Sequence, residues 1–329
     1  LTIEFQNVLP GRRNLIARLA PRKERRQSIL LAPHMDTVGA DPSKFVPRHK
    51  SGRLYGRGAC DTKGSVAAMF SAVCEVARSK DRPAHTELIF AGLIDEENAQ
   101  AGSRALARSG LKADLAIVGE PTQCRVVTAH KGCVWLQIEA RGQAAHGATP
   151  QLGVNAIHRM AKIVERLEVD YARQLRTRRH KLLGAGSINV GTITGGKQPN
   201  IVPDACVIEI DRRYLPGETE KSVIQEIRAL LARHHLTATF ASSKTAPALP
   251  LETDAKLPLV RQFLHCAGQP RALGVDYFCD AAILAAGGIP SIVFGPGDIA
   301  QAHTVDEWIS LSQLERAKDL LVKFFRAQP

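Results

Sequence analysis

The sequence has no run of about 18 consecutive apolar residues, so we expect no membrane-spanning helix and no membrane partner. Its seven cysteines are scattered, odd in number and without a CxxC pair, which argues against a disulfide framework. Unpaired cysteines of this kind are typical of a reducing compartment. We therefore predict a cytoplasmic protein.

Aromatic residues make up only 5% of the chain, and no stacking motif accompanies the basic residues. The basic excess is nevertheless large, with a formal net charge of +12 and a pI near 9.6. A nucleic-acid binder is one interpretation of that charge. Because the basic residues form separate clusters, as at 22–26 and 173–181, we favour solvated basic faces, with attraction of anionic substrates second. We predict no nucleic-acid partner.

The length of 329 residues and the apolar content of 44% suit a globular protein with one large or two ordinary domains. The chain begins at Leu1, inside the strand-like run 1–8, rather than at a methionine. We therefore expect that an N-terminal piece is missing, which leaves a targeting segment open.

Two kinds of secondary-structure pattern are found along the chain. Residues 1–130 and 244–329 combine short apolar strands with amphipathic helices, as in an α/β fold with a mostly parallel sheet. Residues 131–243 follow the order β-α-β-β-α-β of a ferredoxin-like α+β domain. The sequence thus predicts an α/β domain in two parts, interrupted by an inserted domain. A capping box, Ser310-x-x-Gln313, is expected to begin the last helix.

Polar side chains follow four strands of the predicted α/β domain where each strand ends. The strands are 28–32, 88–94, 115–118 and 291–294. The side chains beyond them are His34, Glu96, Glu97, Glu120 and His303, and Asp61 precedes a predicted helix. Because the carboxyl ends of parallel strands meet at one edge of a sheet, we expect these residues to converge.

Each of these acids also has a structural interpretation. Asp61 could be a helix N-cap, residues 95–97 a solvated helix start, and Glu120 part of an ordinary turn. Taken together, two histidines with several carboxylates and no cysteine suit zinc, cobalt or manganese in a catalytic site.

The charge of the set favours two metal ions over one. Two divalent ions bring four positive charges, of which Asp61, Glu97 and Glu120 cancel three and a shared hydroxide cancels the last. Glu96 is left over. A carboxylate beside the metals but not bound to them can move a proton from water to a leaving amine.

Eight segments resemble the acetylornithine deacetylase and succinyl-diaminopimelate desuccinylase family, whose relatives include aminoacylases and glutamate carboxypeptidases. They are APHMDT, GRGACDTKGS, DEE, GEPT, AHGATPQLGVNAI, NIVPDA, DRRY and FGPGDIAQAHTVDEW. The match runs in one order from about residue 30 to the C-terminus. The resemblance implies a zinc-peptidase-like catalytic domain with an inserted lid and dimerisation domain.

The resemblance also assigns roles to the converging residues. His34 and Glu120 would hold one zinc, Glu97 and His303 the other, and Asp61 would bridge both, with Co²⁺ or Mn²⁺ as substitutes. Asp36 would orient His34, which it can reach from two residues away. Glu96 would be the general base and acid. A cis peptide is expected after Asp61.

Residues of the inserted domain and one loop would bind the substrate. By the same resemblance, His146 would reach the site of a partner subunit in a homodimer and help bind the oxyanion. Asn200 and Arg213 would grip the substrate carboxylate together with Gly295 and Gly297.

These expectations define a metal-dependent hydrolase that cleaves the amide of an N-acyl amino acid. Acetylornithine deacetylase-like activity is favoured over succinyl-diaminopimelate desuccinylase, carboxypeptidase or dipeptidase activity. The rival from another class is an inactive relative that only binds a ligand, and the intact ligand set with Glu96 argues against it.

Overall fold

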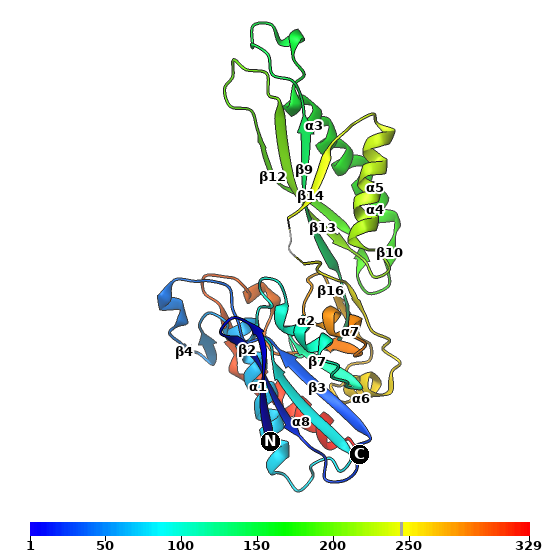
Figure 1. Ribbon diagram of the computed structural model, residues 1–329. Helices are drawn as coiled ribbons and strands as arrows, with labels where there is room; N and C mark the ends of the chain where they lie inside the picture. Colours follow the sequence, from blue (N-terminus) through cyan, green and yellow to red (C-terminus); the bar gives the residue numbers. More distant parts are fainter. Residues whose placement is uncertain (244–245) are drawn as a thin grey trace. The chain divides into compact units, whose positions relative to one another are not determined.

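The structure, a computed structural model, describes residues 1–243 and 246–329 (Figure 1). The chain divides into two compact units. Unit 1 comprises Leu1–Ala129, Leu251–Gly274 and Cys279–Pro329, and unit 2 comprises His130–Pro250 and Val275–Phe278. The predicted boundary at 244 lies outside the described residues. The sequence pattern did not predict that residues 275–278 belong to unit 2.

A mixed sheet with a parallel centre forms the framework of unit 1. Its strands are β1 (Thr2–Leu9), β2 (Arg12–Leu19), β3 (Gln27–Pro33), β6 (Thr86–Gly92), β7 (Leu115–Gly119), β8 (Val127–His130), β15 (Leu251–Glu252), β16 (Leu273–Val275) and β17 (Ser291–Val293). Their order is β1-β2-β6-β3-β7-β17-β8-β15, with β16 beside β8. The neighbours β6, β3, β7 and β17 run parallel, and β1, β2 and β8 pair antiparallel. The predicted α/β class with a mostly parallel central sheet is confirmed.

The central strands are apolar because both their faces are covered. Every residue of β6 and β7 is buried, and so is every residue of β3 except Gln27. Ile29 and Leu31 join one core with the helices, and Leu30 between them is equally buried. Such continuous apolar runs are typical of parallel strands between helix layers.

The helices of unit 1 pack on this sheet and on each other. They are α1 (Gly64–Arg78), α2 (Ala101–Arg108), α6 (Pro258–Cys266), α7 (Ala281–Ala286) and α8 (Leu311–Arg326). Helix α1 lies against α8, and α7 lies against α2, β7 and β17. A small antiparallel sheet of β4 (Arg48–Lys50), β5 (Arg53–Tyr55) and β18 (Trp308–Ser310) precedes α8.

The capping box predicted for α8 is wrong. Ser310 occupies the N-cap position but makes no side-chain cap, and its Oγ lies 2.8 Å from the Oγ of Ser312. The Gln313 side chain instead accepts a hydrogen bond from the backbone N–H of Gly297 at 2.7 Å. A long-range partner has therefore displaced the local one.

The four-stranded sheet of unit 2 and the helices between its strands follow the predicted order β-α-β-β-α-β, with a further helix and a short hairpin inserted between the first helix and the second strand. Its sheet contains β12 (Ser187–Gly195), β13 (Ala205–Tyr214), β9 (Gly132–Arg141) and β14 (Thr239–Ser242), in that spatial order and with antiparallel neighbours. Its helices are α3 (Ala156–Arg166), α4 (Ala172–Thr177) and α5 (Glu220–Arg233), beside a short hairpin of β10 (Arg179–His180) and β11 (Gly184–Ala185). Burial alternates along β9 from residue 134 onwards, as expected for a sheet with helices on one face (Figure 1).

None of the helices in the described ranges is both long enough and apolar enough to cross a membrane.

Candidate metal centre

The predicted side chains converge at the carboxyl edge of the parallel strands of unit 1. His34 follows β3 and Glu120 follows β7, and because Pro33 pairs with Gly119 in parallel register, the two side chains come next to each other. Glu97 follows β6 after a short turn. Asp61 precedes α1, and the Asp61–Thr62 peptide is cis, as predicted.

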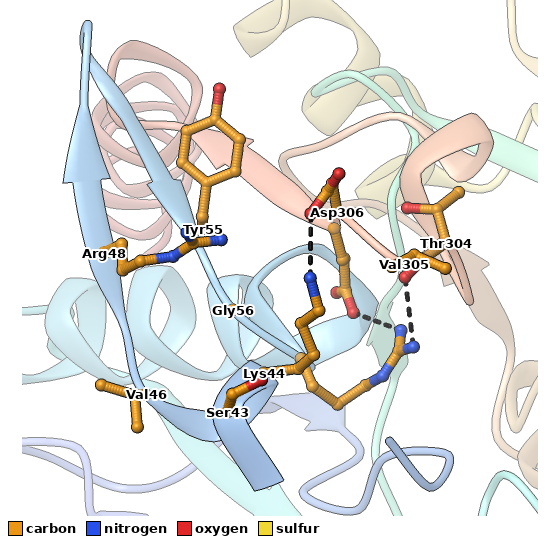
Figure 2. A pocket seen from close by; sticks show the side chains of 11 residues that line it. Ser43, Lys44, Val46, Arg48, Tyr55, Gly56, Thr304, Val305 and Asp306 are labelled. Carbon is orange, nitrogen blue, oxygen red and sulfur yellow. Dashed lines mark hydrogen bonds and ion pairs between the residues drawn. The ribbon is translucent and has the colours of Figure 1, made fainter. Parts of the chain in front are cut away.

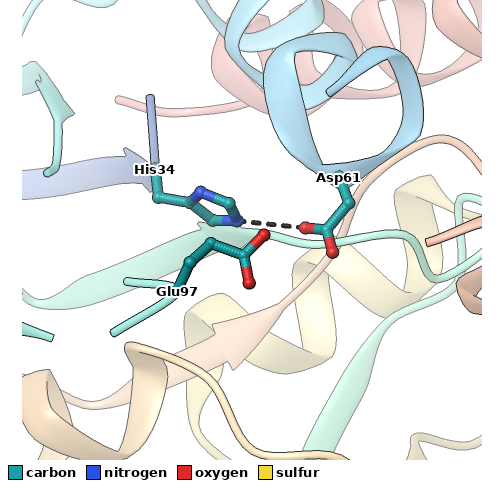
Figure 3. A group of neighbouring side chains, drawn as sticks. All are labelled: His34, Asp61 and Glu97. Atoms are coloured by element: carbon teal, nitrogen blue, oxygen red, sulfur yellow. Dashed lines mark hydrogen bonds and ion pairs between the residues drawn. The ribbon is translucent and has the colours of Figure 1, made fainter. Parts of the chain in front are cut away.

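The ligand atoms fall into two groups that share Asp61. In the first group, the Nε2 of His34 lies 3.1 Å from Oδ1 of Asp61 and 3.8 Å from Oε1 of Glu120. In the second, the Nε2 of His303 lies 3.2 Å from Oδ2 of Asp61 and 3.1 Å from Oε2 of Glu97. Figure 3 shows the Asp61 carboxylate and the Glu97 carboxylate directed toward the His34 ring. Asp61 thus offers one oxygen to each group.

These separations fit metal coordination. Two ligand atoms that each lie 2.0–2.1 Å from a tetrahedral zinc are roughly 3.3 Å apart. Ligand atoms of His34, Asp61 and Glu97 all lie within 4.8 Å of one another. Among the described residues, none forms a hydrogen bond with the buried Oε1 atom of Glu120, which fits a place for a cation.

The backbone carbonyl of Asp36 determines the tautomer of His34. It lies 3.0 Å from Nδ1, and because a carbonyl can only accept, Nδ1 carries a proton and Nε2 is the nitrogen that faces the site. The Asp36 carboxylate lies farther from Nδ1, at 3.7 Å, and accepts the backbone N–H groups of Glu96 and Glu97 at 3.2 Å each. The Asp36 carboxylate therefore faces the His34 ring, as expected, and also holds the segment that carries the two acids.

The pKa shifts reflect a surplus of negative charge. Burial raises the pKa of Glu120 well above its ordinary value, and burial with the neighbouring Asp61 raises that of Glu97. Burial opposes ionisation of Asp61, but both imidazoles outweigh it and lower its pKa. The hydrogen bond to Asp61 contributes most to raising the pKa of His303 to about 9.

Glu96 stands next to both groups without belonging to either. It is partly buried, and its backbone N–H is held by Asp36. Desolvation raises the pKa of Glu96 well above its ordinary value, against the opposing effect of His34. The arrangement suits a carboxylate that holds a proton during a reaction.

Residues 30–327 match peptidase family M20/M25/M40. The chain belongs to this family. It is 32% identical over 325 residues to acetylornithine deacetylase of Myxococcus xanthus, a match that covers 94% of this chain and 82% of that protein.

Solved structures share the fold of the M20/M25/M40 family. Aminopeptidase PepT of Bacillus cereus matches 99% of this chain and 88% of its own, with a TM-score of 0.81 and 23% identity. A dinuclear metal-binding peptidase of the M20 family from Bacillus subtilis matches 98% of this chain and 87% of its own, with a TM-score of 0.69 and 14% identity.

Three of the predicted residues of this family member lie in unit 2. His146 and Asn200 are exposed on adjacent segments, because the N–H of Gly147 donates to the carbonyl of Asn200 at 2.8 Å. The guanidinium of Arg213 already forms a two-pronged ion pair with Asp211, at 2.8 and 2.9 Å. A substrate carboxylate would therefore meet the remaining edge of that guanidinium.

The loop that holds Gly295 and Gly297 is bonded to two other segments of unit 1. The N–H of Gly295 donates to Oγ1 of Thr122 at 3.0 Å, and that of Gly297 donates to Gln313 at 2.7 Å. A Cβ atom at Gly295 would lie 2.5 Å from the carbonyl oxygen of Glu120, so the glycine permits close approach. Both N–H groups are used within the protein, and a role of Gly295 and Gly297 in holding a substrate carboxylate stays a prediction.

Two buried acids near the family's site were missed from the sequence. Asp280 accepts a hydrogen bond from Ser103 at 2.5 Å, and its other oxygen has no hydrogen-bond partner within the part of the chain that the structure describes. Glu307 is 3% exposed and accepts four hydrogen bonds. The only signal for Glu307 was its place in the segment that ends AHTVDEW, because its donors, three backbone N–H groups and the guanidinium of Arg57, lie some 250 residues away.

Proposed function

We propose that this protein is a metal-dependent hydrolase that removes the acyl group from an N-acyl amino acid, with N-acetylornithine as the leading substrate. One observation carries the proposal: two sets of ligand atoms share Asp61, and Glu96 lies beside them. The similarity to relatives named acetylornithine deacetylase supports the choice of substrate class.

The residues present fit two zinc ions, with Co²⁺ or Mn²⁺ as substitutes. His34 and Glu120 would hold one ion, His303 and Glu97 the other, and Asp61 both. When bound, such ions polarise the acyl carbonyl and make water more acidic at neutral pH.

Glu96 would carry the proton between the two halves of the reaction. Its carboxylate takes a proton from the water that attacks the acyl carbon, and the C–N bond then breaks. The same carboxyl group gives that proton to the departing nitrogen, so the products are a carboxylate and a free amine. Because the Asp36 carboxylate holds the N–H of Glu96, Asp36 keeps this group in place.

Unit 2 would complete the site in a homodimer. We propose that it acts as lid and dimerisation domain, that His146 serves the partner's site as an oxyanion donor, and that Asn200 and Arg213 receive the substrate carboxylate. Their exposed or partly exposed positions support this role. The seven free cysteines support a cytoplasmic location.

A hydrolysis screen combined with metal analysis tests the proposal. The metal-stripped protein is reloaded with zinc, cobalt or manganese and offered N-acetylornithine, N-succinyl-diaminopimelate and dipeptides. Release of ornithine at the highest kcat/KM is expected, with about two ions bound per chain. Preferential cleavage of the succinyl compound or of dipeptides would reassign the substrate, and metal binding with no hydrolysis of any of them would favour an inactive binder.

A further inference from the structure

Glu307 uses its whole carboxylate to hold the backbone that leads to Asp61. Its Oε1 accepts the N–H groups of Cys60 and Asp61, at 2.8 and 2.9 Å. Its Oε2 accepts the N–H of Gly58 at 2.9 Å and the guanidinium of Arg57 at 2.8 Å. Four donors on one buried carboxylate are charge-assisted hydrogen bonds, which are stronger than neutral ones.

A second set of bonds ties the loop 303–307 to the same segment. The backbone carbonyl of Glu307 accepts the N–H of Gly56 at 3.0 Å, and the carbonyl of Thr304 accepts a second N–H of Arg57 at 3.1 Å. Figure 2 shows the outer tie, in which Lys44 pairs with Asp306 at 3.0 Å. The cavity between the two segments is about 10 Å³, room for about one water molecule.

The two segments that Glu307 joins are the ones that bring Asp61 and His303 together. Glu307 lies four residues after His303 on one loop, and its carboxylate holds the N–H of Asp61 on the other. The Oδ2 atom of Asp61 lies 3.2 Å from the Nε2 of His303, and Oδ1 lies 3.1 Å from the Nε2 of His34. A shift of the 303–307 loop would change the first distance and leave the second nearly unchanged, whereas a shift of the segment that carries Asp61 would change both.

We propose that Glu307 is a positioning residue that fixes Asp61 against His303, and thereby sets the pocket for the second metal ion. The proposal rests on the proposed function. It assigns Glu307 no contact with substrate or metal. Glu307 acts by holding the backbone N–H of Asp61 in place, as residues that hydrogen-bond to metal ligands commonly do.

The test compares Glu307→Gln with the wild-type protein in cobalt titrations of metal-stripped samples. A glutamine turns one carboxylate oxygen into an N–H₂ donor that faces other donors, so at least two of the four bonds are lost. We expect two cobalt ions per wild-type chain. In the variant we expect the second ion to bind about 10–100-fold more weakly, with an altered cobalt absorption spectrum and a kcat that falls more than KM changes.

The matched control is Asp306→Asn, which removes the same charge from the neighbouring residue. Asp306 is 73% exposed and contacts Lys44 only at the surface. This control should bind both ions as the wild type does. Should Glu307→Gln not fold, Arg57→Met carries the test, because it leaves the three N–H bonds of Glu307 in place. A roughly threefold to tenfold weaker second ion is then expected.

The outcomes separate this inference from the proposed function. Normal binding of both ions by Glu307→Gln and by Arg57→Met, with only the resistance to urea reduced, would overturn the positioning role. A wild-type protein that binds fewer than two ions, or binds two without hydrolysing any N-acyl amino acid, would instead overturn the proposed function.

Discussion

Units 1 and 2 both bury charged side chains, but they balance them differently. In unit 2, the side chain of Arg212 is fully buried. Its Nη2 donates to both oxygens of Glu218 at 3.2 Å, and its Nε donates to the hydroxyl of Tyr171 at 3.3 Å. Arg178 grips both oxygens of Glu226, at 2.6 and 2.8 Å, and also reaches Glu218 at 3.0 Å. Two guanidinium groups therefore face two carboxylates.

The site of unit 1 has no such balance. Its carboxylates are Asp36, Asp61, Glu96, Glu97 and Glu120, and its basic groups are the imidazoles of His34 and His303. With all five acids ionised and both rings protonated, these side chains would have a formal net charge of minus three, from five acids less two rings. Burial, together with the neighbouring acids, raises the pKa values of Glu96, Glu97 and Glu120, and one oxygen of Glu120 has no hydrogen-bond partner among the described residues.

The comparison distinguishes a charged network that is complete in the protein from one that is completed by ions. A buried ion pair stabilises only when each charge has its partner, and removal of one partner is costly. Unit 2 satisfies that condition with its own residues. The described side chains of the unit 1 site do not satisfy it by themselves, so its surplus of acids supports the proposed metal ions.

The largest expected effect is the loss of turnover in Glu96→Gln. Glutamine keeps the shape of the side chain but cannot take up a proton, so kcat should fall by about 10²–10⁴ while two metal ions still bind. Steady-state kinetics with metal analysis measures both quantities. The matched variant in unit 2 is Glu218→Gln, which should leave kcat per folded molecule unchanged. Unchanged hydrolysis in Glu96→Gln would remove Glu96 from the mechanism.

The next effect concerns stability. Arg212→Met removes one cation from the network of unit 2 and leaves Glu218 and Glu226 with Arg178 alone, so the free energy of unfolding should drop by about 3–5 kcal/mol. Urea unfolding should give the same loss with and without zinc, because the network needs no ion. A loss that zinc repairs would contradict the distinction between the units. The double variant Arg212→Met, Glu218→Gln should recover part of the stability.

The strand-end pattern predicted the site well because it depends on local periodicity. An apolar run followed by a ligand residue fixes both the strand and the edge of the sheet at which His34 or Glu120 appears. The order of helices and strands in unit 2 was likewise predictable, from the alternation of apolar and polar residues along 132–141 and the helical spacing of apolar residues after it.

The residues that were misjudged all depend on long-range backbone hydrogen bonds. Gln313 was predicted to be a capping partner, but its side chain accepts a hydrogen bond from the backbone N–H of Gly297. Glu307 holds backbone donors near residue 60, which no spacing in one sequence reveals. Side-chain types can be read from a sequence, whereas the N–H group that a carboxylate will accept depends on the folded path of the chain.

His130 sharpens the comparison, because unit 2 also buries one titratable group without an opposite charge. Burial lowers the pKa of His130 to about 4, and its Nε2 has no partner among the described residues. In the unfolded chain the imidazole of His130 binds a proton below about pH 6.5, whereas in the folded chain it does so only below about pH 4. The stability therefore falls as the pH drops below 6.5 and levels off below about 4. Between pH 8 and pH 5 the loss should be about 2 kcal/mol. Urea midpoints of the wild type and of His130→Asn across this range measure it, and an equal pH slope in both proteins would show that His130 is not the cause.

The smallest expected effect is that Glu120→Gln changes the free energy of unfolding in opposite directions without and with zinc. In the metal-free protein this buried carboxyl has a raised pKa, so Glu120→Gln removes a group that disfavours folding at pH 7 and should stabilise by about 1–2 kcal/mol. With zinc present the same variant should be less stable than the wild type, because it has lost a ligand and the ion then adds less binding free energy to the folded state. Thermal unfolding of both proteins with and without zinc shows whether the two curves cross. Glu218→Gln is the control, and it should lower the stability both with and without zinc. If Glu120→Gln also lowers the stability under both conditions, the surplus of acids in unit 1 is not a binding site for a cation.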